Sequence, residues 1–148
     1  MSDTSVSASR VIAAEPQTLF DLVADPSMHA VIDGSDSVRG TRGGSRKLGM
    51  GDRFTTNMRI GVPYLISNRV VEYEEGRRIA WAHLGRWRWR WEFVPVDGGT
   101  EVTETFDWSS SPARAYVTFA GWPARNRANI ERTLERLDAY VTNKRSAT

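Results

Sequence analysis

The feature that most constrains the fold of this chain is the stretch GRWRWRWEF, residues 85–93, in which tryptophan and arginine alternate strictly. Side chains on a β-strand point to opposite faces with period two, whereas a helix would scatter these tryptophans around its circumference. The stretch is therefore predicted to be a strand with two unlike faces. The aromatic face carries Trp87, Trp89, Trp91 and Phe93, and the charged face carries Arg86, Arg88, Arg90 and Glu92.

Interleaved arginines and aromatic rings also suggest a grip on nucleic acid, but such a grip needs cations and stacking rings on one surface. Here they lie on opposite faces, so we prefer a buried aromatic face and a solvated charged face. The 20 basic and 18 acidic side chains leave a net charge of only +2, which creates no strong field for polyanions. We expect no nucleic-acid partner and keep binding through the strand arginines and the basic loop Arg42, Arg46 and Lys47 as a third alternative.

The length of 148 residues suits one domain with a core large enough to enclose a cavity. We expect a single domain over residues 1–148, ordered from about residue 5 to about residue 142. The chain has no cysteine, which excludes disulfides and thiolate zinc sites and is typical of a reducing compartment. The first residues, MSDTSVSASR, hold neither a basic segment nor an apolar run, and no stretch approaches the ~20 apolar residues that cross a bilayer. We expect a cytoplasmic protein without a transmembrane segment.

The first third of the chain predicts one strand, two short helices and a loop. A strand is expected at residues 5–13, and Glu15-Pro16 then offers a cap and a proline for the first turn of a helix. Asp25-Pro26 ends that helix and begins a second short one through residues 28–31. The glycine-rich segment 33–51 predicts a loop with one short edge strand near residues 38–42.

The middle of the chain predicts five strands, separated by the short turn signals of an antiparallel meander. They are expected at residues 53–59, 64–73, 78–83, 86–94 and 100–108. Ser111-Pro112 opens a helical stretch that Gly121-Trp122-Pro123 interrupts, and a last helix is predicted over residues 123–143. Its apolar positions recur at helical spacing: Ile130, Leu134, Leu137 and Val141. This order of elements predicts an α+β fold in which a curved antiparallel sheet wraps around the long C-terminal helix, with two short helices near the N-terminus.

Four segments carry a resemblance to a known family: ASRVIAAEPQTLFDLVADPSMHAVIDG, GDRFTTNMRIGVPYLISNRVVEYEEGRRIAWAH, GGTEVTETFDW and NIERTLERLDAYV. From about residue 5 to about residue 141, the chain resembles the polyketide cyclase/dehydrase branch of the START and birch-pollen-allergen-like (SRPBCC) superfamily. The resemblance implies a helix-grip fold with a hydrophobic cavity between the sheet and the C-terminal helix. Members bind lipids, sterols, polyketides or other apolar molecules there, and some cyclise or dehydrate aromatic polyketides. No catalytic signature of the cyclases is found at named positions, so the resemblance assigns no active-site residue.

Strand parity yields candidate cavity residues if the apolar face of each strand is the concave one. The ligand-binding candidates are Phe54, Met58, Trp81, Trp87, Trp89, Trp91, Phe106 and Trp108, which share that face with Thr56, Ile79, Phe93 and Val102. Four tryptophans on adjacent strands suit a pocket for a planar ring system, and a closed core is an equal alternative. The strand at residues 64–73 is ambiguous, because Val70 and Val71 are adjacent and either parity or a bulge fits.

Glu104 and His83 are the ionisable members of the predicted concave face. A carboxylate there is costly to bury unpaired, so Glu104 needs a partner or a proton. One hypothesis makes Glu104 a cavity acid/base with a raised pKa and His83 as its partner. The alternative is a carboxylate paired with an arginine near the rim of the sheet, with His83 at the solvated end of a strand and His29 on a loop or helix surface. The histidine spacing predicts no metal site.

Two functions fit these observations. The first is binding of a hydrophobic, aromatic or polycyclic small molecule in an internal cavity, by burial and stacking. The second is a cofactor-free polyketide cyclase/dehydrase of aromatase type that uses Glu104 and His83 in the same cavity. We expect no cofactor, and a monomer or a weak homodimer.

Overall fold

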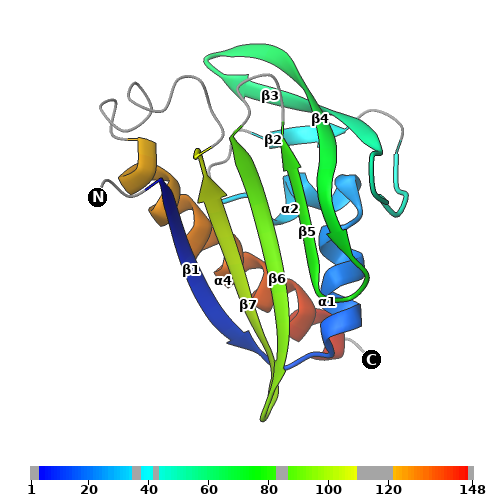
Figure 1. Cartoon of the computed structure of the whole chain (residues 1–148). Helices are drawn as coiled ribbons and strands as arrows, with labels where there is room; N and C mark the ends of the chain where they lie inside the picture. Colours follow the sequence, from blue (N-terminus) through cyan, green and yellow to red (C-terminus); the bar gives the residue numbers. More distant parts are fainter. Residues whose placement is uncertain (1–3, 35–37, 42–43, 83–86, 110–121, 147–148) are drawn as a thin grey trace.

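The computed structural model of the chain describes residues 4–34, 38–41, 44–82, 87–109 and 122–146. Seven strands form one antiparallel sheet in the order β1-β7-β6-β5-β4-β3-β2, so the first strand pairs with the last (Figure 1). The bounds are β1 Ser5–Ile12, β2 Val38–Thr41, β3 Arg53–Ile60, β4 Val62–Glu74, β5 Arg78–Ala82, β6 Arg88–Val96 and β7 Gly99–Asp107. The predicted meander is confirmed as the run from β3 to β7, in which each strand pairs with the next.

Among the described residues, four helical elements accompany the sheet: α1 Pro16–Val23, the 3-10 turn η1 Pro26–Met28, α2 His29–Ile32 and α4 Trp122–Ser146. Pro16 stands in the first turn of α1, as predicted, because a missing N–H costs nothing there. Asp25 caps η1 by accepting a hydrogen bond from the backbone N–H of Ser27 (2.9 Å). The helical stretch predicted after Ser111 lies outside the described residues.

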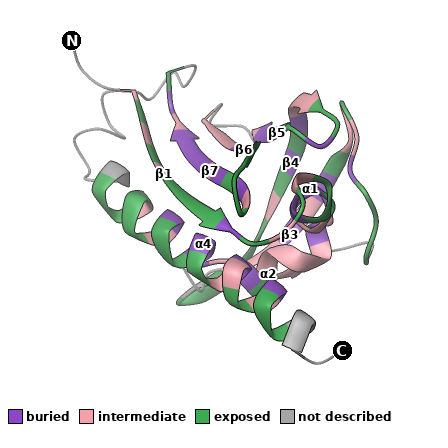
Figure 2. Ribbon diagram, turned by 90° about the horizontal axis from the view of Figure 1, so that it is seen from below, coloured by how far each residue is buried: buried purple, intermediate pink, exposed green. Residues whose placement is uncertain are grey.

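Helix α4 lies across the concave side of the sheet and contacts β1, β7 and α2. Its buried residues face the sheet and its exposed residues face away (Figure 2). The predicted apolar stripe is confirmed, because Ile130, Leu134, Leu137 and Val141 are all buried. The helix-grip arrangement is therefore observed, with the sheet curled around one long helix. No helix of the described residues is long and apolar enough to span a bilayer.

The loop after α2 is fastened to α4 at Gly34. The backbone N–H of Gly34 donates to Thr133 Oγ1 (2.8 Å), and the Gly34 carbonyl accepts from Arg132 Nε (2.9 Å). A Cβ at position 34 would lie 2.5 Å from the Asn129 carbonyl oxygen, so any larger residue would push this loop off the helix. This contact holds the end of α2 against α4 at the margin of the cavity described below.

The core fills one end of the concave face. Phe20 of α1 packs edge-on against Phe93 of β6, with ring centroids 5.7 Å apart, and Tyr73 of β4 packs on its other side at 5.6 Å. In β4 the register shifts between Val70 and Glu72, which is a bulge. The bulge resolves the parity left open by the sequence: Val70 is buried and Val71 is half-buried.

Candidate functional site

The charged face of β6 is occupied by ion pairs within the sheet. Glu72 of β4 accepts hydrogen bonds from Arg88 and Arg90, each at 2.9 Å, and Arg90 also donates to Asp107 of β7 at 3.1 Å. The hydrogen bond from Arg90 lowers the pKa of Glu72, with burial opposing it and Arg88 assisting. These two arginines neutralise neighbouring carboxylates of the convex face.

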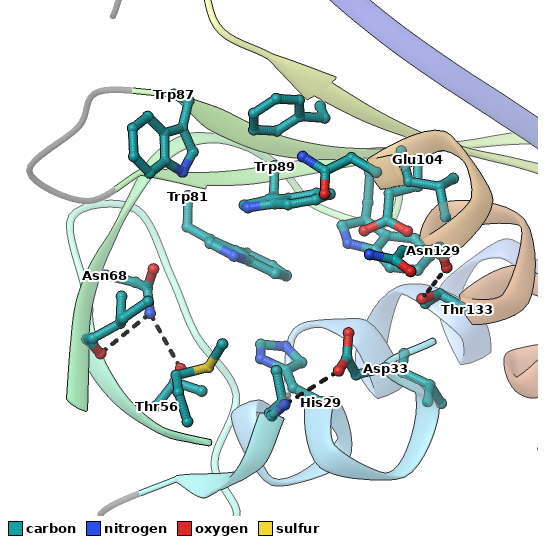
Figure 3. A pocket seen from close by; sticks show the side chains of 18 of the residues that line it. His29, Asp33, Thr56, Asn68, Trp81, Trp87, Trp89, Glu104, Asn129 and Thr133 are labelled. Atoms are coloured by element: carbon teal, nitrogen blue, oxygen red, sulfur yellow. Dashed lines mark hydrogen bonds between the residues drawn. The ribbon is translucent and has the colours of Figure 1, made fainter. Parts of the chain in front are cut away.

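The opposite face opens into a cavity of about 620 Å³ between the sheet, α2 and α4. Side chains from six strands and both helices converge on it, and Figure 3 shows those of Trp81, Trp87, Trp89 and Glu104 around a common space. This volume lies within the range of pockets that take drug-sized ligands. The sheet supplies Val38, Phe54, Thr56, Met58, Arg59, Tyr64, Ile66, Asn68, Trp81, Trp89, Trp91, Glu104 and Phe106 to its wall, with Trp87 just before β6.

The aromatic wall is held in a fixed arrangement by ring contacts. The Trp81 indole stacks on the His29 imidazole, with centroids 4.7 Å apart and planes inclined by 24°. Phe54 packs edge-on against Trp81 at 5.5 Å, and Trp89 tilts against Phe106 at 4.9 Å. Rings fixed by such contacts lose little freedom when a planar molecule enters, which favours stacking as the mode of binding.

Glu104 projects from β7 into this cavity. Glu104 is 6% exposed, and its Oε1 atom is buried with no hydrogen-bond partner from any described residue. Burial raises the pKa of Glu104 well above its ordinary value, and the negative charge of Asp33 adds to the effect. No ion pair joins its side chain to another described residue, so the predicted alternative of a rim salt bridge is wrong within the part of the chain that the structure describes.

His29, rather than His83, is the histidine that the structure places at the cavity. The sequence assigned His29 to a loop or helix surface, and this was wrong: it begins α2 and lines the cavity together with Ile32, three residues later on the same helical face. Its Nε2–H donates to the Val23 carbonyl (2.9 Å). Burial lowers the pKa of His29, although that hydrogen bond and two nearby aspartates oppose the shift. His83 lies outside the described residues.

The structure brings together seven of the eight ligand-binding candidates: Phe54, Met58, Trp81, Trp87, Trp89, Trp91 and Phe106. Trp108 is the exception, because it is fully buried, stacks on Phe106 at 5.4 Å and does not line the cavity. Its parity is that of the concave face, but it follows the end of β7, so it packs into the core. No group of three or more metal-ligating side chains occurs among the described residues.

Several polar wall residues were missed by the sequence reasoning. Asn68 donates to Thr56 Oγ1 (3.1 Å), and Asp33 accepts from the Val38 backbone N–H (3.2 Å). Asn68 was missed because the parity of β4 was open; it pairs with Phe54 of β3, which puts it on the face of Thr56. Helix α4 contributes Arg125, Asn126, Asn129, Ile130, Arg132 and Thr133, of which only Ile130 was expected to face the sheet.

A curled antiparallel sheet that grips a long helix over an internal cavity defines a protein of the helix-grip, SRPBCC class. The chain belongs to the family described as "Polyketide cyclase / dehydrase and lipid transport", whose model matches residues 3–142. The resemblance stated from the sequence is thus confirmed.

Similar proteins agree with this assignment. The chain is 39% identical over 143 residues to "Uncharacterized protein Rv0088" of Mycobacterium tuberculosis, covering 92% of this chain and 64% of that protein. It therefore spans less than two thirds of that curated relative. The crystal structure of protein NE0264 from Nitrosomonas europaea matches with a TM-score of 0.71 at 16% identity, covering 95% of this chain and 96% of the other. An AHSA1-like protein from Aeromonas hydrophila matches with a TM-score of 0.65 at 22% identity, over 95% and 93%. These two structures share the fold.

Proposed function

We propose that the chain binds a hydrophobic, aromatic or polycyclic small molecule in the cavity between the sheet and α4. The observation that carries this proposal is the wall of four indoles, Trp81, Trp87, Trp89 and Trp91, around about 620 Å³. A closed core would bury these rings against one another at the packing density of a protein interior. Trp87 and Trp89 instead remain half-buried and border the cavity. A planar ligand would cover this apolar surface and gain both burial and stacking.

The test is native mass spectrometry of the purified protein with a panel of polycyclic aromatic compounds, sterols and fatty acids. We expect a stoichiometric adduct with planar aromatic compounds. Trp89→Phe, which shrinks one ring of the wall, weakens the adduct several-fold because stacking area is lost. Trp108→Phe is the matched control: the same change in a tryptophan outside the cavity leaves affinity unchanged in protein that circular dichroism shows to be folded. Absence of any adduct with every class would contradict the proposal.

A second candidate is a cofactor-free cyclase or dehydrase. It is favoured by Glu104 in the cavity wall, whose buried Oε1 atom has no hydrogen-bond partner among the described residues. A carboxyl whose pKa is raised by burial holds its proton to higher pH than an exposed glutamate, and the protonated form is able to act as a general acid toward a bound carbonyl or hydroxyl group. In this version Glu104 donates a proton to a leaving hydroxyl, which departs as water, and the resulting carboxylate takes up the proton lost from the adjacent carbon as the C=C bond forms, so the net loss is one water. Glu104→Gln should then still bind substrate but no longer release a product lighter by one water; unchanged turnover would contradict a catalytic role.

A further inference from the structure

Two polar atoms in the cavity wall lack the partners that buried polar atoms normally have. They are Nε1 of Trp91 and Oε1 of Glu104, and both are buried with no hydrogen-bond partner in the described residues. Trp91 is 2% exposed and Glu104 is 6% exposed. The large majority of buried polar side-chain atoms in native proteins do have a partner, so each exception requires an explanation.

The two atoms belong to neighbouring side chains. Trp91 of β6 and Glu104 of β7 are direct partners in the antiparallel register, so both point to the concave face. Residues in this position have Cβ atoms about 4.5–5.5 Å apart. Both residues also line the cavity, where Glu104 projects toward the space bounded by the other indoles (Figure 3). The two unpartnered atoms therefore come from adjacent positions on the sheet face that borders the cavity.

The neighbouring polar groups are already engaged, which isolates this pair. His29 donates through Nε2 to the Val23 carbonyl, and Asn68 donates to Thr56. Thr133 donates to the Asn129 carbonyl at 2.9 Å and accepts from the Gly34 N–H. In the described wall, Trp91 and Glu104 are the side chains with a buried nitrogen or oxygen atom that has no hydrogen-bond partner.

We propose that Trp91 and Glu104 form a two-point hydrogen-bonding site for one oxygen atom of the ligand, a ketone or quinone carbonyl on its aromatic ring system. This rests on the proposed function and narrows it from an apolar aromatic molecule to one that carries a carbonyl oxygen. An indole N–H only donates, so its partner must be an acceptor. A carbonyl oxygen has two lone pairs and accepts from the indole N–H and from the carboxyl O–H together.

The protonation of Glu104 agrees with this role. Burial and the charge of Asp33 raise its pKa, which extends to higher pH the range over which the carboxyl carries a proton to donate. An organic cation fits less well, because the Trp91 N–H would then face a positive charge. A ligand carboxylate fits less well too, because it would add a further negative charge beside Asp33.

The test compares two tricyclic probes that differ in one group: 9-fluorenone, with a carbonyl, and fluorene, with a methylene in its place. Dissociation constants are measured by equilibrium dialysis against the full chain. We expect fluorenone to bind about tenfold tighter than fluorene, as two hydrogen bonds of ordinary strength allow. Fluorene is the more apolar probe, so burial alone predicts the opposite preference.

Four variants locate the two donors. Trp91→Phe keeps a ring but loses the N–H, and Glu104→Leu loses the carboxyl; each should reduce the ratio of the two dissociation constants several-fold. Trp89→Phe is the matched control, since it makes the same change to a neighbouring indole and should weaken both probes alike. Glu104→Gln retains a donor in the amide and should preserve the ratio. The carbonyl stretching band of bound fluorenone should shift to lower wavenumber in the wild type and return upward in Trp91→Phe.

A pH series adds a readout that a packing role would not move. As pH rises through the raised pKa of Glu104, the carboxyl group loses its proton and becomes a carboxylate, so the preference for fluorenone declines. The Glu104→Gln variant should keep its preference for fluorenone over the same range. The other ionisable groups of the wall are shared by both proteins, so the difference between their profiles reports Glu104. They are His29, Asp33, Arg59, Tyr64, Arg125 and Arg132.

The outcomes separate the two proposals. Equal binding of fluorenone and fluorene by the wild type, or a preference that survives both Trp91→Phe and Glu104→Leu, would overturn the two-point site and leave the aromatic cavity standing. Binding of neither probe, together with no adduct in the mass-spectrometric panel, would overturn both.

Discussion

Two glutamates on neighbouring parts of one sheet have opposite environments. Glu72 lies on the convex face between Arg88 and Arg90, and its pKa is lowered chiefly by the hydrogen bond from Arg90. Glu104 lies on the concave face, its Oε1 atom has no hydrogen-bond partner in the part of the chain that the structure describes, and its pKa is raised by burial. The charges of the convex face thus neutralise one another, whereas Glu104 on the concave face has a carboxyl oxygen that no described residue engages.

This difference bears on function because structural carboxylates are normally satisfied by the protein itself. Glu72 is satisfied in this way, because its two oxygens accept hydrogen bonds from two guanidinium groups. Its removal would disturb only the surface of the sheet. Glu104 has a neighbour that also lacks a partner, Trp91, and both border an aromatic cavity. An unsatisfied pair is costly for folding, so its position in a cavity favours a role in binding.

The largest expected effect tests whether the two faces of β6 differ in packing. Phe93 is 1% exposed and contacts Phe20, whereas the next residue, Val94, is 52% exposed on the other face. Phe93→Ala should lower the free energy of unfolding by about 3–5 kcal/mol, because it removes a core ring and leaves a cavity. Val94→Ala should cost less than about 1 kcal/mol, the span of strand propensity. Urea denaturation measures both.

Equal costs for the two substitutions would contradict the division of β6 into a packed face and a solvated face. A small cost for Phe93→Ala alone would mean that the aromatic end of the concave face is as open as the end bounded by Trp87 and Trp89.

The sequence predicted the fold well because its signals were local and redundant. Alternation in residues 85–93 determined the two faces of β6, and the turn glycines delimited the meander. Period-two parity in the neighbouring strands β5 and β7 placed Trp81 and Glu104 on the same face as Trp87, Trp89 and Trp91. His29 was missed because its role depends on where α2 docks, which no local pattern records. Trp108 was wrongly predicted to line the cavity, because parity determines which face of the sheet a side chain is on. It does not determine whether that part of the face borders the cavity or the core.

The second prediction concerns pH and distinguishes the two glutamates directly. The folded-state pKa of Glu104 is raised above its ordinary value of 4.5, so the folded protein holds this proton more tightly than the unfolded chain. Its contribution to stability is present below pH 4.5 and is lost as pH rises through the folded pKa. The pKa of Glu72 is lowered from the same value, so its contribution is present above pH 4.5 and is lost as pH falls toward the folded pKa.

Free energies of unfolding measured across this pH range for two variants should therefore diverge in opposite directions. Glu104→Gln should remove the decline on the neutral side and leave stability unchanged or raised at pH 7. Glu72→Gln should remove the acid-side loss and lower stability at pH 7 by about 1–2 kcal/mol, a hydrogen-bonded pair discounted for solvent screening. A loss of stability at neutral pH in Glu104→Gln would indicate that its carboxylate is ionised and paired, contrary to the comparison.

The smallest expected effect is a response to salt. Raising ionic strength from about 0.05 M to about 0.5 M shortens the Debye length to a few ångströms and screens partly exposed pairs such as Arg88–Glu72. Added salt should lower the free energy of unfolding of the wild type slightly more than that of Glu72→Gln, because only the wild type has these pairs to lose. The difference between the two losses should be less than about 1 kcal/mol. Among the described residues no ion pair involves Glu104, so the preference for fluorenone over fluorene should stay constant over the same range. If this preference falls with salt, charge selects the ligand rather than a neutral carboxyl and an indole N–H. Interactions between charged groups would then dominate on both faces of the sheet.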